Sequence, residues 1–186
     1  MTALDRLLQH WRIHKARRFI PWGARVLDIG SVDGVLFRAI PGLAPNCLGI
    51  DPTLKARVVE ENFTLVPGFF PQAMPAGEKF DIITLLAVLE HFPDAAHESL
   101  TTGCAAFLKP GGRMIITVPS PLVDQILKVL AALRLVHGMA LEEHHGYDVG
   151  KTARIFCAPN FRLIRHERFQ LGLNNLFVFE RTPAGS

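Results

Sequence analysis

The sequence has few of the features that mark secreted, membrane-spanning or metal-binding proteins. Three of its 186 residues are cysteine, Cys47, Cys104 and Cys157, and they lie more than fifty residues apart. This number and spacing predict neither a disulfide framework nor a metal site. No uninterrupted apolar run approaches the roughly 20 residues of a membrane-spanning helix, and charged residues interrupt the N-terminus before the apolar core of a signal peptide can form. We therefore expect a cytoplasmic protein with reduced thiols.

Charged residues are also scarce, at 20 %, whereas apolar residues reach 49 %, which is enough to fill the core of one globular domain. The net charge of +3 is unevenly distributed. Residues 1–25 carry six basic residues and one acidic residue, a balance of +5, and the remaining chain carries −2. Such a basic segment is either a solvated helix face or a contact for phosphate or an anionic membrane. No recognition module accompanies it, so nucleic-acid binding is not expected.

Helical and strand-like segments alternate along the chain, which predicts parallel βαβ units in a doubly wound α/β sheet. We expect one domain over residues 1–186. Its N-terminal helical segment, 1–23, should carry an apolar stripe of Leu4, Leu7, Leu8, Trp11, Ala16 and Phe19. Strands are expected over 25–29, 47–50, 63–66, 80–86 and 113–118, and helices over 35–40, 53–60, 95–108, 122–136 and 149–158. The segments 161–170 and 176–181 are too close together for a crossover, which predicts an antiparallel C-terminal hairpin.

The most informative stretch runs from Val26 to Gly34, where a strand leads through a glycine-bearing turn into a helix. Ligands of open α/β sheets bind at the carboxyl ends of the strands, where this turn lies. Gly30 and Gly34 allow the backbone to approach a ligand without an intervening Cβ. Asp51 ends the next strand, 21 residues after Gly30. Its carboxylate is placed to accept hydrogen bonds from both ribose hydroxyls of an adenosine.

The charges around the turn distinguish between adenosine cofactors. Dinucleotide sites use the pattern G-x-G-x-x-G and hold a pyrophosphate. Here the glycines are spaced Gly30-x-x-x-Gly34, with Asp28 before the turn and Asp33 inside it. These carboxylates repel a pyrophosphate and attract a sulfonium and an ammonium, so the charge pattern favours S-adenosylmethionine over NAD.

Four ordered blocks now give a resemblance to a known family. VLDIGSVDG at 26–34, GIDP at 49–52, FDIITLLAVLEHFPD at 80–94 and LKPGGRMIITVPSP at 108–121 resemble the class I S-adenosylmethionine-dependent methyltransferases. The resemblance implies a Rossmann-like, seven-stranded sheet in a three-layer αβα sandwich, with S-adenosylmethionine as methyl donor and S-adenosylhomocysteine as product. The cofactor-binding residues that it implies are Asp28, Gly30, Ser31, Gly34, Asp51, Pro52, Gly68, Phe69, Leu85 and Leu86.

Two departures from the family pattern concern the same site. Val32 stands where the family commonly has glycine, so either the turn differs locally or Val32 adopts an ordinary φ angle. The stretch Val66–Phe69 lacks the acidic residue that often follows the third strand of the family. We therefore expect apolar contact with Phe69 or Phe70, together with backbone groups, to hold the adenine.

The acceptor side is less defined by the sequence. If the acceptor is a hydroxyl, His91, His144 and His145 are candidate general bases. Alternatively, Glu90 and His91 tie loops together by hydrogen bonds. His144 and His145 follow two glutamates, but no third spaced ligand is present and no metal is expected.

An apolar insertion follows the last parallel strand of the predicted sheet. The segment 121–148 is expected to be a lid over the acceptor, and its apolar part, 121–138, is alternatively core packing, a homodimer contact or a membrane-surface contact. The predicted function is methyl transfer to a small or medium-sized acceptor with an apolar portion. A non-catalytic cofactor-binding scaffold and a nucleotide-dependent oxidoreductase are the alternatives.

Overall fold

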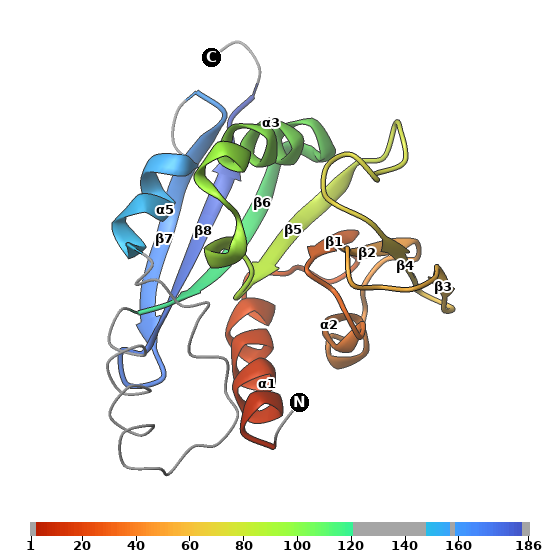
Figure 1. Cartoon of the computed structure of the whole chain (residues 1–186), viewed down its shortest axis with the longest axis horizontal. Helices are drawn as coiled ribbons and strands as arrows, with labels where there is room; N and C mark the ends of the chain where they lie inside the picture. The colour runs from red at the N-terminus through yellow and green to blue at the C-terminus, as the bar shows by residue number, and fades with distance from the viewer. Residues whose placement is uncertain (1–2, 121–147, 157–158, 184–186) are drawn as a thin grey trace.

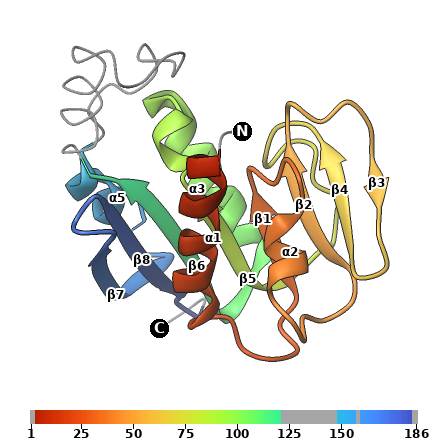
Figure 2. The same ribbon diagram turned by 90° about the horizontal axis from the view of Figure 1, so that it is seen from below.

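The computed structural model describes residues 3–120, 148–156 and 159–183. Eight strands form one sheet in the order β3-β4-β2-β1-β5-β6-β8-β7, and Figure 2 shows them side by side in this order. The strands are β1 (Val26–Ile29), β2 (Cys47–Asp51), β3 (Val58–Val59), β4 (Phe63–Pro67), β5 (Phe80–Leu86), β6 (Leu108–Pro119), β7 (Phe161–Phe169) and β8 (Asn174–Arg181). The helices are α1 (Ala3–Arg17), α2 (Val35–Ala39), α3 (His97–Phe107) and α5 (Val149–Ile155), with short 3-10 turns η1 (Leu89–His91) and η2 (Asp94–Ala96).

The pairing of the strands confirms the predicted sheet. β1, β2, β4, β5 and β6 are parallel to their neighbours within this set, and β8 lies antiparallel between β6 and β7. One strand was not predicted: Val58 and Val59 form β3, antiparallel to β4, where the sequence predicted a helix over 53–60. Two adjacent β-branched residues favour extended backbone, and β4 offers a free edge for them to pair with. The sheet therefore has one short strand more than the seven expected.

Helices cover both faces of the sheet and produce the predicted αβα sandwich (Figure 1). On one face, Val26 and Ile82 pack with Ile13 of α1 and Phe37 of α2. The opposite face buries the alternate residues of the same strands against Leu100 of α3 and Phe156, which directly follows α5. Every residue of β1 is buried, Asp28 included, which explains why apolar residues occupy both faces of this strand rather than alternate ones.

Helix α1 forms as predicted, but only part of its predicted stripe is buried. Ala16 faces the core together with Ile13, which the prediction left out, whereas Leu7 and Trp11 expose 60 % and 42 % of their surface. The small Ala16 side chain, fully buried, lets the helix backbone approach the sheet closely. None of the described helices is long and apolar enough to cross a membrane.

Candidate functional site

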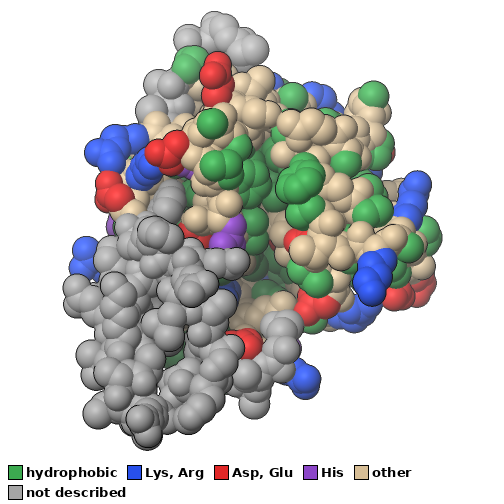
Figure 3. Space-filling model, in the orientation of Figure 1, with side chains coloured by type: hydrophobic (Ala, Val, Ile, Leu, Met, Phe, Trp, Pro, Cys, Tyr) green, Lys and Arg blue, Asp and Glu red, His purple; other side chains and the backbone are tan. Residues whose placement is uncertain are grey.

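A cavity of about 1120 Å³ opens at the carboxyl ends of β1, β2, β4 and β5. Strand order reverses between β1 and β5, and this switch point is where open α/β sheets bind ligands. Figure 3 shows hydrophobic side chains on both sides of a hollow in this face of the molecule. Each of the four strands contributes the residues that follow it. They include Gly30 and Val32 after β1; Asp51, Pro52 and Thr53 at β2; Gly68, Phe69 and Phe70 after β4; and Ala87, Val88, His91 and Phe92 after β5.

The turn after β1 has the backbone shape that its glycines allow. Gly30 and Gly34 have φ angles of 86° and 66°, whereas Val32 keeps an ordinary φ, one of the two outcomes expected for it. A Cβ atom at Gly30 would lie 2.3 Å from Cγ2 of Val88. Glycine at this position therefore lets the segment after β5 close against the turn. Gly34 instead lies beneath the ring of Phe63, where a Cβ would lie 2.7 Å from a ring carbon, so its role is in packing.

A second cavity, of about 280 Å³, lies on the α1 side of the same turn. Its walls include Gln9 and Arg12 of α1, together with Asp28, Gly30, Ser31, Asp33 and Leu86. Asp28 is buried, and its Oδ1 accepts a hydrogen bond of 2.6 Å from the Thr84 hydroxyl. Burial raises the pKa of Asp28 to about 6, and the bond from Thr84 offsets only part of this effect. The two cavities share Ile29, Gly30 and Val32, so the turn separates a large apolar space from a small charged one.

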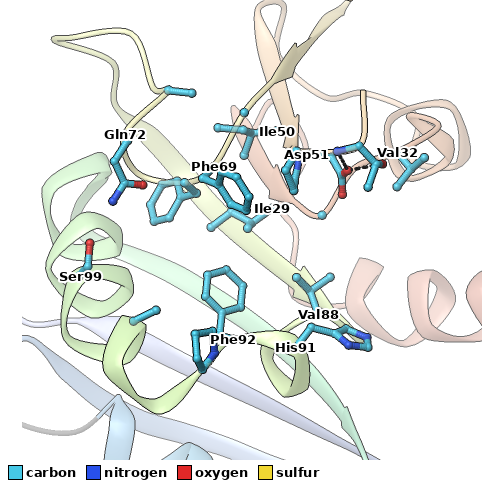
Figure 4. A pocket seen from close by; sticks show the side chains of 18 of the residues that line it. Ile29, Val32, Ile50, Asp51, Phe69, Gln72, Val88, His91, Phe92 and Ser99 are labelled. Carbon is cyan, nitrogen blue, oxygen red and sulfur yellow. Dashed lines mark hydrogen bonds between the residues drawn. The ribbon is translucent and has the colours of Figure 1, made fainter. Parts of the chain in front are cut away.

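Asp51 is buried at the edge of the large cavity with one carboxylate oxygen already engaged. Its Oδ1 accepts hydrogen bonds from the backbone N–H of Thr53, at 2.7 Å, and from the Thr53 hydroxyl (Figure 4). These bonds fix the orientation of the carboxylate. Oδ2 is then the oxygen through which Asp51 can accept bonds from a ligand.

The opposite wall of the large cavity is built by the segment that follows β5. Figure 4 shows Val88, His91 and Phe92 on one side of the cavity and Phe69 with Ile50 on the other. Ala87 makes the sharp change of direction with a φ of 59°, an uncommon conformation for a residue with a Cβ. Its N–H donates to the carbonyl oxygen of Thr117 at 2.9 Å, which holds the turn in place. Within the described part of the chain, the cavity thus has one imidazole in an otherwise largely apolar wall.

Glu90 and His91 are neighbours in η1 with different surroundings. His91 lines the large cavity, whereas the Glu90 carboxyl lies within the electrostatic influence of the Arg12 guanidinium of α1. Burial raises the pKa of Glu90 to about 7, and the positive charge of Arg12 opposes this rise. Burial likewise lowers the pKa of Arg12. Glu90 therefore faces the charge of α1, whereas His91 belongs to the cavity wall.

The structure brings together part of the predicted set of site residues. Gly30, Asp51, Pro52, Gly68, Phe69 and His91 line the large cavity, and Asp28, Ser31 and Leu86 line the small one. Leu85 is fully buried in the core that faces α3, and no part of it lines either cavity. His144, His145 and the segment 121–147 lie outside the described residues.

Several residues of the two cavities were not predicted. In the sequence, nothing distinguishes Val88 and Phe92 from other apolar residues, and the pattern assigns Gln9 and Arg12 to the polar side of a helix. The one sequence signal for Arg12 was its place in the basic segment, because tertiary packing decides which basic residues turn inward. Among the described residues, no group of three or more His, Cys, Asp or Glu side chains is placed to hold a metal ion.

Comparisons with known proteins agree with this geometry. A family model described as a methyltransferase domain matches residues 3–165. The ubiquinone biosynthesis O-methyltransferase of Cupriavidus pinatubonensis is 28 % identical over 135 residues, which are 68 % of this chain and 53 % of that protein. The enzyme of the same description from Thiobacillus denitrificans is 36 % identical over 100 residues, 48 % of this chain and 42 % of that protein. The chain thus spans about half the length of the curated relatives it matches.

Solved structures share the fold at lower sequence identity. Magnesium protoporphyrin IX methyltransferase from Synechocystis PCC 6803, with bound SAH, superposes with a TM-score of 0.71 and 16 % identity, covering 98 % of this chain and 89 % of that one. An S-adenosylmethionine-dependent methyltransferase from Mesorhizobium loti gives a TM-score of 0.68 and 19 % identity, covering 94 % of this chain and all of that one. At these identities the likeness shows the fold.

Proposed function

This chain belongs to the methyltransferase-domain family of S-adenosylmethionine-dependent enzymes, and from that premise we propose that it methylates a hydroxyl of a small acceptor with an apolar portion. Two observations support the choice of acceptor. The relatives of Cupriavidus and Thiobacillus are O-methyltransferases, and most of the side chains that line the large cavity are apolar. The observation that carries the proposal is one cavity with a buried carboxylate at one side and an imidazole at the other.

The residues around the turn fit the cofactor in shape and in charge. We propose that Asp51 Oδ2 accepts hydrogen bonds from the ribose and that Phe69, 70 % exposed at the cavity, covers the adenine. The missing Cβ of Gly30 leaves the turn open for the methionine part. Asp28 supplies the negative charge that an ammonium needs, and Gln9 and Arg12 in the small cavity suit a carboxylate. A pyrophosphate in the same place would meet Asp28 and Asp33.

The acceptor chemistry asks little of the protein beyond alignment and proton removal. S-adenosylmethionine supplies a methyl group that its sulfonium has already activated. Val88 and Phe92 hold the apolar portion of the acceptor and exclude water. His91 accepts the proton that the acceptor hydroxyl loses as its oxygen is methylated. Alignment of the two reacting groups contributes most of the acceleration.

The cofactor assignment is tested with Asp51→Asn, measured by calorimetry with S-adenosylmethionine and S-adenosylhomocysteine. The amide keeps the oxygen that Thr53 bonds and removes the charged acceptor, so both affinities should fall by roughly 10- to 100-fold. Glu61→Gln, an exposed carboxylate outside both cavities, is the matched control. Unchanged affinity in a folded Asp51→Asn protein would remove Asp51 from the site.

The role of His91 is tested separately from cofactor binding. His91→Gln should lower kcat by about 100-fold or more with a phenolic acceptor and leave the Kd for S-adenosylmethionine unchanged. His166→Gln, on β7 and outside both cavities, is the control. If His91→Gln keeps the full rate, another group accepts the proton that the acceptor hydroxyl loses. Saturation with the cofactor without turnover of any acceptor favours the scaffold alternative.

A further inference from the structure

The outer face of α1 carries exposed apolar residues that the proposed site does not use. Leu7 and Trp11 are one helical turn apart, so their side chains lie on the same side of the helix. They expose 60 % and 42 % of their surface, although each is large and apolar. The opposite side of α1 packs into the core through Ile13 and Ala16. The exposed pair is therefore a surface feature of a helix that is held firmly in place.

Basic residues flank this pair. With 100° per residue, the arc centred on Leu7 and Trp11 also contains His10, His14 and Lys15, and Arg6 and Arg17 lie at its two margins. Lys15 is half-buried and the other four are exposed. Asp5, the one acidic residue of α1, lies about 200° from Leu7 and so points to the other side of the helix.

Just beyond the helix, one carboxylate, Glu167, neutralises part of the positive charge. Arg18 lies 3.4 Å from Glu167 of β7, and the positive charge of Lys15 also acts on that carboxylate. Asp5 is the one carboxylate of α1, against Arg6, Arg12, Lys15 and Arg17. The face as a whole therefore remains positive.

We propose that this face of α1 docks on an anionic lipid surface. The pairing of a tryptophan and a leucine with flanking arginines is what the boundary between headgroups and acyl chains accommodates, because apolar side chains insert there while cations meet the lipid phosphates. A nucleic acid offers the phosphates but no place to bury Leu7. The inner face of the same helix places Gln9 and Arg12 in the small cavity, so docking sets the edge of the catalytic site beside the membrane. The docking does not depend on the proposed acceptor.

The two tryptophans of the chain provide a direct test. Trp22→Phe leaves Trp11 as the sole indole, and Trp11→Phe leaves Trp22, which is 82 % exposed in the loop after α1 and contacts Gly42. Both proteins are titrated with vesicles of brominated phosphatidylcholine containing 30–40 % phosphatidylglycerol, about the composition of a strongly anionic membrane. We expect a blue shift and quenching of Trp11 but not of Trp22. Neither signal should change with pure phosphatidylcholine vesicles or at about 1 M salt, where charges are screened beyond a few ångströms.

Point variants separate the two contributions in vesicle co-sedimentation of the full chain. Arg17→Gln should weaken binding about fivefold, the effect expected for one cation near an anionic surface. Leu7→Ser should weaken it by roughly tenfold or more through lost apolar burial. Arg57→Gln, an exposed arginine away from α1, is the matched control and should bind like the unaltered protein. All four proteins should bind S-adenosylmethionine with equal affinity, which distinguishes this test from that of the proposed function.

Three results would overturn the proposal. Equal binding to neutral and anionic vesicles would exclude the charge contribution. Quenching of Trp22 with Trp11 unaffected would move the contact to another surface. A Trp11 emission that is already blue-shifted without vesicles would show that protein rather than lipid covers this face. Light scattering would then tell whether a second copy covers it, in a dimer, or the monomer itself does.

Discussion

Asp28 makes protein stability and cofactor binding respond to pH in opposite directions. Its pKa is raised from 3.8 to about 6 because the carboxyl is buried beneath the glycine turn. The folded protein therefore holds a proton that the unfolded chain has released between about pH 4 and pH 6. This contribution to stability is complete below about pH 4 and is lost as the pH rises through 6.

The size of the effect follows from the shift. About two pKa units correspond to about 3 kcal/mol between the two protonation states. Asp28→Asn keeps an oxygen to accept the bond from Thr84 and removes the charge. We expect the variant to raise the free energy of unfolding by about 2–3 kcal/mol at pH 7.5 and to change it little at pH 4, measured by urea denaturation without cofactor.

The same substitution should weaken the cofactor site. If the ammonium of S-adenosylmethionine binds the ionised carboxylate, about a tenth of the protein is competent at pH 5 and about nine tenths at pH 7, so the Kd should fall about tenfold across this range. Asp28→Asn should bind weakly at both pH values and lose this dependence. Glu90→Gln is the control, because Glu90 is the other carboxyl whose pKa burial raises, and this variant should keep the pH dependence of the Kd. The reasoning is refuted if Asp28→Asn keeps the tenfold slope, or if it is destabilised equally at pH 4 and pH 7.5.

Further predictions concern the turn and the core. Gly30→Ala should reduce the affinity for S-adenosylmethionine at least tenfold in calorimetry, because the new Cβ meets Val88 at 2.3 Å and the φ of 86° disfavours alanine. Adding Val88→Ala should restore part of the lost affinity. Leu100→Ala should lower the free energy of unfolding by about 2–5 kcal/mol in urea titrations, since Leu100 is 1 % exposed against the sheet. Burial raises the pKa of the Cys104 thiol, so in Cys47→Ser/Cys157→Ser protein it should react with a disulfide reagent at pH 8 only when urea unfolds the chain.

The strands were predictable because parallel strands are buried on both faces and leave nearly continuous apolar runs. The run from Phe80 to Leu86 was expected as a strand and is β5 with the same bounds. The face of α1 was not predictable in the same way, because apolar residues lie on more than one side of the helix. The predicted stripe joined Leu7 and Trp11 to Ala16, whereas the sheet receives Ala16 with Ile13 and leaves Leu7 and Trp11 exposed.

Sequence order, together with the family resemblance, placed one part of the candidate site. Residues that follow parallel strands meet at one edge of the sheet, which applies to Gly30, Asp51 and His91, and the resemblance added Gly68; all four line the large cavity. The left-handed conformation of Ala87 left no sign in the sequence, since alanine seldom adopts it. Which arginine of the basic segment turns inward depends on how α1 is rotated against the sheet, and hence on contacts between distant parts of the chain.

The position of β8 has a consequence for synthesis on the ribosome. This strand comes last among the described elements and yet lies inside the sheet, where seven residues of β6, from Arg113 to Pro119, pair with it. Until residues 174–181 leave the exit tunnel, the nascent chain carries β6 with an open and largely apolar edge, the kind of edge that pairs with other chains. A transcript cut short before codon 174 would therefore yield an aggregation-prone fragment and a natural client for ribosome-associated chaperones, even though every strand around the cofactor turn has already been made.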